Sequence, residues 1–201
     1  PRMDRQETTY DPVAKAIHWG VAALIFVMFV SALCMDAPDS LISPENRPTV
    51  YLVHKSTGVL VLLLMVFRLF WFHIKPRPPL PVHLMPPWQV VAARIVHVAL
   101  YILAILTPLV GWALVSMGTN GWSFFTLFEL PRLPLAEFAT SHVYLREITG
   151  DMHETCATIF AGLIVIHIGA TFLHHFVDRD DVLLRISPVC LHGWLKRLRG
   201  E

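Results

Sequence analysis

Four long apolar runs, near residues 17–35, 51–73, 90–117 and 153–177, constrain this chain more than any other feature of its sequence. A helix rises about 1.5 Å per residue, so each run can cross a hydrocarbon layer about 30 Å thick. The only acidic residue inside the runs is Glu154, in the first turn of the fourth. The mean hydropathy of +0.56 is also too high for a water-soluble domain. We therefore predict an all-α fold, an integral membrane four-helix bundle.

Lysine and arginine are distributed unevenly around these four spans. The N-terminal tail, the connection between the second and third spans and the C-terminal tail, counted with the span ends beside them, carry 12 of the 16 cations. Such an excess marks the cytoplasmic side, so we expect both termini in the cytoplasm. We expect one domain over residues 1–201, with an extended proline-rich loop at 76–87 and an aromatic-rich loop at 118–152 folded back on the bundle mouth.

Charge and cysteine usage exclude several classes of protein. The net charge is only +1 and no basic cluster is interleaved with aromatic residues, which argues against nucleic-acid binding. Cys34, Cys156 and Cys190 show neither a paired metal-binding spacing nor a Cys-x-x-Cys-His motif. The cysteines therefore predict neither a zinc site nor a covalently attached cofactor.

Histidines are unusually frequent in so apolar a chain. Apart from His73, His174 and His175 at the cytoplasmic span ends, five of the eleven lie on the spans: His18, His54, His97, His153 and His167. An imidazole in hydrocarbon is costly unless it is paired or ligated, so each is a functional candidate. The fourteen residues from His153 to His167 rotate a helix by four turns less about 40° and advance it about 21 Å. One helix face therefore offers two ligands at opposite membrane depths.

Depth then selects a partner for each of these two ligands. His18 opens the first span at the inner side, level with His167, and His54 opens the second span at the outer side, level with His153. The pattern predicts two bis-histidine iron sites, each able to hold a porphyrin between helices, with Gly58 leaving room beside His54. Propionates need cations, and Arg68 lies on the same face at the inner end, with Lys55 and Arg146 outside.

Two other interpretations of the membrane histidines are structural hydrogen bonding and metal-ion transport. Histidines can simply hydrogen-bond to one another or to carbonyls, but four of them in two depth-matched pairs make that interpretation less favourable. Transport of zinc or copper would require carboxylates or thiols at the midplane, and the spans carry none there. His97 has no partner left at its depth, so a role beside a haem or a propionate competes evenly with ordinary interhelical hydrogen bonding.

With these residues the chain resembles the bacterial cytochrome b561 family, di-haem membrane cytochromes, and especially the members described as superoxide:ubiquinone oxidoreductases. A more distant similarity joins the b-type subunits of membrane hydrogenases and formate dehydrogenases. The resemblance rests on Ile17–Trp19, on His54 with Gly58 and Arg68, on His97 ahead of Leu109–Gly111, and on His153–Thr155, His167, His174–His175 and Leu183–Arg185. It implies two non-covalent b haems with His18, His54, His153 and His167 as axial iron ligands.

The resemblance also implies a reaction. Superoxide would be oxidised at the outer haem, and ubiquinone would be reduced with electrons from the inner haem. The outer side carries eight acidic residues against four cations, a net charge of 4 − 8 = −4. This field opposes an anionic substrate, so we expect Lys55 and Arg146 to form a local positive landing site.

The quinone site is expected at the inner end, near His174 and Arg68. Seven helical residues separate His174 from His167, a rotation of about 700° that returns it to within 20° of the ligand face, about 10 Å nearer the cytoplasm. An imidazole there can hydrogen-bond a quinone carbonyl and relay protons. The alternative is that His174 and Arg68 only hold haem propionates.

Two competing functions share the same histidines. The first is a non-catalytic electron-transfer subunit, docked through its acidic outer face to a periplasmic redox protein. The second is a haem-binding sensor or structural membrane protein, which is less favoured because neither tail is long enough for a signalling domain.

Overall fold

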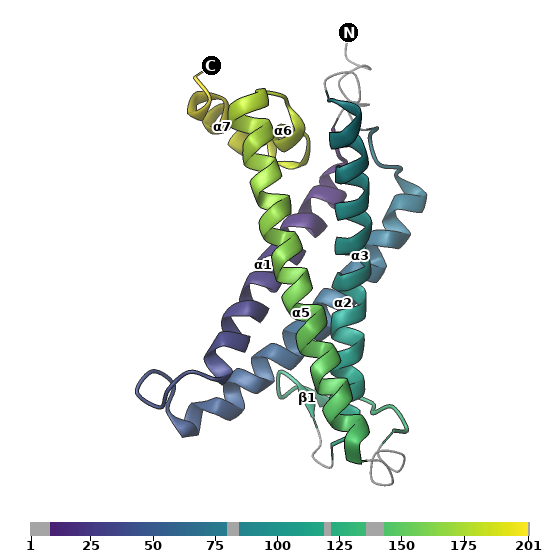
Figure 1. Cartoon of the computed structure of the whole chain (residues 1–201), viewed down its shortest axis with the longest axis vertical. Helices are drawn as coiled ribbons and strands as arrows, with labels where there is room; N and C mark the ends of the chain where they lie inside the picture. Colours follow the sequence, from purple (N-terminus) through teal and green to yellow (C-terminus); the bar gives the residue numbers. More distant parts are fainter. Residues whose placement is uncertain (1–8, 80–84, 119–121, 136–142, 201) are drawn as a thin grey trace. The chain divides into compact units, whose positions relative to one another are not determined.

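Four long helices dominate the computed structural model, which describes residues 9–79, 85–118, 122–135 and 143–200 (Figure 1). They are α1 (Pro12–Met35), α2 (Arg47–Ile74), α3 (Pro87–Ser116) and α5 (Val143–Phe172). All four are long and apolar enough to cross a membrane. The prediction of an all-α membrane protein with four spans is thereby confirmed. The fourth helix begins at Val143 and not near residue 153, and α3 continues through Pro108.

The remaining elements are short. A single turn, η1 (Pro44–Asn46), precedes α2, and a hairpin of β1 (Ser123–Phe124) and β2 (Phe128–Glu129) follows α3. Past α5 come a π-helix (Leu173–Asp178, η2), α6 (Val182–Ile186), η3 (Val189–Leu191) and α7 (His192–Leu198). Parts of the two loops expected at 76–87 and 118–152, residues 80–84, 119–121 and 136–142, lie outside the described residues.

The start of α1 shows how local sequence positions the spans. Pro12 occupies the first helical position, where its missing N–H costs nothing. Asp11 caps the helix, because its carboxylate accepts a hydrogen bond from the Ala14 N–H at 3.2 Å. The same carboxylate oxygen accepts the Trp71 Nε1–H of α2 at 2.6 Å. One side chain thus fixes the helix start and ties α1 to the end of α2.

Contacts divide the chain into two compact units, and each unit contains part of all four long helices. We call Pro1–Trp19, Phe67–Ile102 and Phe160–Glu201 the terminal unit, and Gly20–Val66 and Leu103–Ile159 the loop unit. The terminal unit includes the segment after α5, and the loop unit includes the hairpin. Each unit contains two or more of the span histidines.

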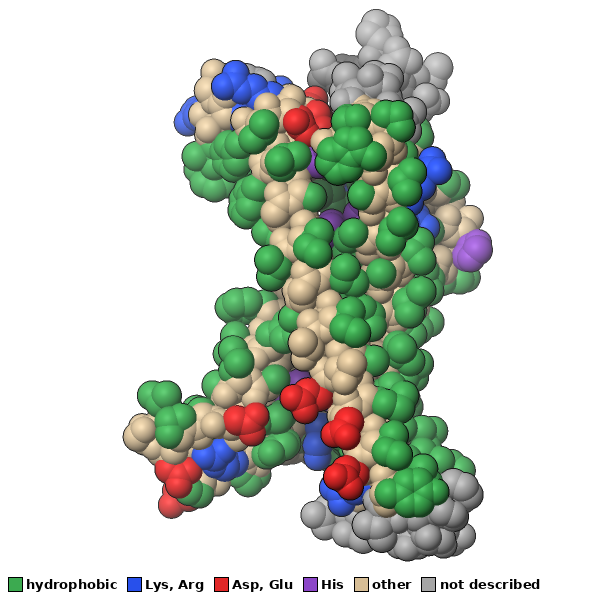
Figure 2. All heavy atoms as spheres, viewed as in Figure 1, with side chains coloured by type: hydrophobic (Ala, Val, Ile, Leu, Met, Phe, Trp, Pro, Cys, Tyr) green, Lys and Arg blue, Asp and Glu red, His purple; other side chains and the backbone are tan. Residues whose placement is uncertain are grey.

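Large apolar side chains face outward along all four long helices (Figure 2). Phe26, Leu63, Ile102 and Val165, one from each helix, are exposed by 70%, 58%, 56% and 71%. A water-soluble protein would bury such side chains, whereas in a membrane the lipid covers them. The exposed surface therefore agrees with the hydropathy of the sequence.

The segment after α5 folds into a cap within the terminal unit. His175 is fully buried, and its Nε2 lies 3.0 Å from the Leu195 carbonyl oxygen of α7. Arg199 donates to the Asp180 carbonyl and to the Asp181 carboxylate, both at 2.8 Å. These bonds hold α7 against the end of the fourth span.

Candidate functional site: two groups of span histidines

The loop unit contains one pair of facing imidazoles, His54 of α2 and His153 of α5. Their ring centroids lie 6.3 Å apart and their planes are inclined at 79°. His54 Nδ1 lies 3.2 Å from the Met28 carbonyl and 3.1 Å from Ser31 Oγ, and His153 Nδ1 lies 3.0 Å from the Thr107 carbonyl. A carbonyl only accepts, so both Nδ1 atoms carry the hydrogen and both Nε2 atoms keep a lone pair for a metal.

Gly111 makes the position of His153 possible. A Cβ atom built on Gly111 would lie only 2.9 Å from His153 Cε1, closer than real Cβ contacts come. Gly111 lies one helical turn after Thr107, so the ring packs on bare backbone while it donates to the Thr107 carbonyl. Gly58, expected to leave room beside His54, faces the Met28 side chain, 3.5 Å from its would-be Cβ.

The terminal unit brings together His18 of α1, His97 of α3 and His167 of α5. The His18 and His167 ring centroids lie 6.4 Å apart, and those of His97 and His167 lie 5.3 Å apart. The expectation that His97 has no partner at its depth is therefore wrong. Helix α3 places His97 beside His167, at a membrane depth that the limits of the apolar runs did not define.

Ring spacing distinguishes the pairs that can share a metal from the pair that cannot. An iron bonded to two imidazoles at about 2 Å, with about 1.1 Å from nitrogen to ring centroid, needs centroids roughly 6.2 Å apart. The spacings for His18 with His167 and His54 with His153 match this requirement, at 6.4 and 6.3 Å. His97 lies too close to His167, at 5.3 Å, for an iron between them. Depth and spacing thus select the same two pairs.

Arg68 and His174, expected together at a quinone site, have different partners. Arg68 Nη1 lies 3.0 Å from His18 Nδ1. His174 is buried in the cap, with Nδ1 at 2.7 Å from the Asp180 carboxylate and 3.3 Å from that of Asp178. Among the described residues no hydrogen bond, ion pair or ring contact joins Arg68 to His174.

The placement of His174 also departs from the helical register used to predict it. The α-helical register of α5 ends at Phe172, and a π-helix continues from Leu173 to Asp178. A π-helix turns less per residue than an α-helix, so the face of His167 cannot be extrapolated past Phe172. Sequence reasoning missed Asp180 for the same reason, because α-helical periodicity does not bring it to His174.

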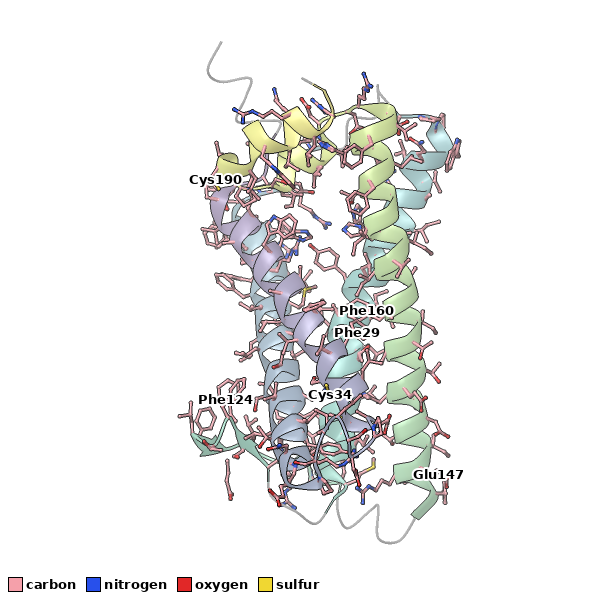
Figure 3. The ribbon with its side chains drawn as sticks, turned by 90° about the vertical axis from the view of Figure 1, so that its left-hand side faces the viewer. Phe29, Cys34, Phe124, Glu147, Phe160 and Cys190 are labelled. Atoms are coloured by element: carbon pink, nitrogen blue, oxygen red, sulfur yellow. The ribbon has the colours of Figure 1, made fainter. Side chains whose placement is uncertain are left out.

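Lys55 and Arg146 are neighbours in the loop unit. Lys55 is half-buried with Nζ 5.9 Å from the centre of the Tyr51 ring, and the exposed Arg146 is close enough to interact with it electrostatically. Three acidic residues are exposed on the first turns of α5, and Glu147 projects away from that helix (Figure 3). They are Glu147, Asp151 and Glu154, and the last two line a shallow hollow of about 350 Å³ with Thr155, Thr158 and Ile159.

Four apolar spanning helices with paired internal histidines define a membrane b-type cytochrome. The sequence matches the family described as "Prokaryotic cytochrome b561" over residues 9–188, so the chain belongs to the prokaryotic cytochrome b561 family. It is 35% identical to "Cytochrome b561 homolog 1" of Escherichia coli (strain K12) over 175 residues, 86% of this chain and 93% of that protein. It is 31% identical to "Probable superoxide oxidase CybB" of Yersinia pestis over 180 residues, 89% of this chain and 96% of that protein.

Family membership makes the chain an integral membrane electron-transfer protein that binds b-type haem. The residues present fit that group. The imidazole pairs have the required spacing, and in the loop unit both Nε2 atoms are left free for iron by carbonyl bonds to Nδ1. In the terminal unit Arg68 Nε is buried without a hydrogen-bond partner, as expected beside an anionic group that carries carboxylates.

Replacing Gly111 tests how His153 is positioned. Gly111→Ala places a Cβ only 2.9 Å from His153 Cε1, so the ring must move and its hydrogen bond to the Thr107 carbonyl is disturbed. We expect the affinity for haem at this pair to fall about tenfold or more, the usual cost of displacing a ligand, with less bound haem measured as the pyridine haemochrome. The control is Gly162→Ala, whose Cβ would meet nothing within 4 Å. Full haem content with an unchanged spectrum in Gly111→Ala would show that the close approach is unimportant.

Proposed function

We propose that the chain holds two non-covalent b haems, one between His54 and His153 and one between His18 and His167, and moves electrons across the bacterial inner membrane with both termini in the cytoplasm. The observation that carries this proposal is the pair spacing, 6.3 Å in the loop unit and 6.4 Å in the terminal unit. When bound, the haems supply one-electron transfer. Two histidines at each iron leave no open coordination position, so substrates react at the protein surfaces.

Superoxide is the proposed electron donor at the periplasmic side. Each superoxide gives up one electron and leaves as dioxygen. The similarity to a protein named as a probable superoxide oxidase supports this choice. Lys55 and Arg146 supply two neighbouring positive charges in the loop unit, the unit that contains His54 and His153. Their role is to attract the anion against the surrounding acidic residues.

Ubiquinone is the proposed acceptor at the cytoplasmic side, and it takes up two electrons and two protons. His174 is the proposed proton donor to the quinone oxygen, whereas Arg68, which contacts His18, is assigned to the haem propionates. Asp180 engages His174 Nδ1 at 2.7 Å, which fixes the ring and leaves Nε2 as the nitrogen available to a substrate. Histidine suits this role because its charge changes near physiological pH.

A second candidate function is an electron-transfer subunit that receives electrons from a periplasmic redox protein. The exposed acidic side chains of Glu147, Asp151 and Glu154 favour it, because they lie on neighbouring turns of one helix and could face a basic partner. Activity of the protein alone separates the two functions.

Replacing one histidine of each pair tests the two sites separately. We expect His153→Leu to lose mainly the haem of the loop unit and His167→Leu mainly that of the terminal unit, because each removes one of two axial ligands. Optical and paramagnetic resonance spectra of the remaining low-spin haem measure the loss, and acid acetone should extract all haem. His73→Leu, at an exposed position of α2, is the control. Equal loss of both haems from either change would contradict the pairing.

Charge reversal tests the superoxide landing site in proteoliposomes that contain this protein alone and ubiquinone. We expect superoxide consumption to slow as salt rises, and to slow about tenfold in Lys55→Glu or Arg146→Glu, because steering is a rate effect. Lys196→Glu, exposed on α7, makes the same charge change elsewhere and should have no effect. A rate that rises with salt would mean that the acidic field dominates. No consumption without an added donor protein would favour the docking function.

Replacing His174 tests the quinone site. We expect His174→Leu to keep both haems reducible by superoxide while ubiquinol formation falls about tenfold or more, the usual effect of losing a general acid. His174→Gln, which keeps a hydrogen-bonding side chain but cannot relay protons at neutral pH, should show the same loss. Full ubiquinol formation in either variant, or loss of the haem between His18 and His167, would place the quinone site elsewhere.

A further inference from the structure

Two arginines in the terminal unit share one pair of aromatic rings. The Arg68 guanidinium carbon lies 5.7 Å from the Phe72 ring centre and 5.4 Å from that of Tyr101. The Arg77 guanidinium carbon lies 4.8 and 5.4 Å from the same two centres. The rings themselves are 6.4 Å apart. Cation–π contacts thus hold two like charges close together.

The positive charges of this pair lack a counterion in the described part of the chain. Neither arginine forms an ion pair with a described carboxylate, whereas Arg47 and Arg199 do. Arg68 Nε is also buried with no hydrogen-bond acceptor. A buried N–H without an acceptor is costly, so the Nε of Arg68 favours an anion beside it, and Arg77 adds a second positive charge at the same two rings.

The anion site adjoins the histidines of the terminal unit. Arg68 contacts His18 directly, with Nη1 at 3.0 Å from Nδ1, and it is near enough to His167 to act on it electrostatically. Both Arg68 and Arg77 act in the same way on His97. An anion held by the two arginines would therefore lie beside the proposed haem.

The contact between Arg68 and His18 places a cation beside one of the two proposed iron ligands. Arginine only donates hydrogen bonds, so Arg68 Nη1 donates to His18 Nδ1 at 3.0 Å. In the loop unit the corresponding Nδ1 atoms face backbone carbonyl oxygens. The terminal unit thus differs from the loop unit in bringing a positive charge to its ligand pair.

We propose that Arg68 and Arg77 form a clamp for the two propionate carboxylates of the haem held between His18 and His167, an inference that rests on the proposed function. Guanidinium groups match carboxylates with two parallel hydrogen bonds, and the contacts with Phe72 and Tyr101 hold both groups in place. The clamp would hold the carboxylates next to His18, which Arg68 contacts directly.

Reconstitution of the haem-free full chain with haem b or with its dimethyl ester tests the clamp. The ester keeps the iron and the ring but lacks the negative charges. We expect Arg68→Gln to weaken haem b binding at this site about tenfold or more, and the exposed Arg77→Gln to weaken it less. With the dimethyl ester, both variants should bind as the unchanged protein does. Arg94→Gln, exposed on α3, is the matched control.

The midpoint potential provides a second readout. Where Arg68→Gln still binds haem b at this site, its potential should fall, because the lost cation had opposed the ferric charge. The loop-unit haem should keep its spectrum and potential, which shows that the variant is folded. If Arg68→Gln binds no haem at either site, the same measurements are made on Arg68→Lys. Lysine keeps the positive charge but cannot form the two parallel hydrogen bonds of a guanidinium.

The outcomes separate the clamp from the proposed function. Equal weakening with haem b and with its ester would overturn the clamp, and would mean that the arginines stabilise the fold or bind a lipid phosphate. Unchanged haem b binding in both variants would also overturn it, while two bound haems would keep the proposed function intact. Binding of fewer than two haems by the unchanged protein would instead contradict the proposed function.

Discussion

An imidazole buried in a membrane needs a partner for each of its two nitrogens, and the rest of this structure depends on how that need is met. Water is absent and lipid offers no hydrogen bonds, so every partner must come from the protein or from a bound group. His54 and His153 each direct Nδ1 at a backbone carbonyl. Their Nε2 atoms are then free for the proposed iron, and the close packing at Gly111 serves this arrangement.

The two units meet this need by different means. In the loop unit the partners of Nδ1 are backbone carbonyls, whose positions are fixed by helices α1 and α3. In the terminal unit the partner of His18 is the charged side chain of Arg68. A backbone acceptor positions a ligand through the helix itself, whereas Arg68 also brings a positive charge to the site. On the proposed function, the two units therefore give their haems different electrostatic surroundings.

Sequence periodicity predicted the part of the site that lies within regular α-helices. Four apolar runs predicted four spans, and the rotation and rise between His153 and His167 placed one of them in each unit. The prediction failed where a contact does not depend on side-chain identity and where the helix is not an α-helix. The acceptors at Met28 and Thr107 are backbone atoms that any residue would supply. The neighbour of His97 depends on the depth of α3 in the membrane. The length of an apolar run does not define that depth to better than several residues.

The π-helix after Phe172 explains why the tail belongs to the site. Its wider turn ends the α-helical register of the fourth span and lets Asp180 reach back to His174, at 2.7 Å. Asp180 is itself held twice, by the Val182 N–H at 3.0 Å and by Arg199 on its carbonyl oxygen at 2.8 Å. A proton donor must be held at a fixed position relative to the group that it protonates. On the proposed function, the cap meets this demand, because the carboxylate that orients His174 is itself anchored by the polar segment after the fourth span.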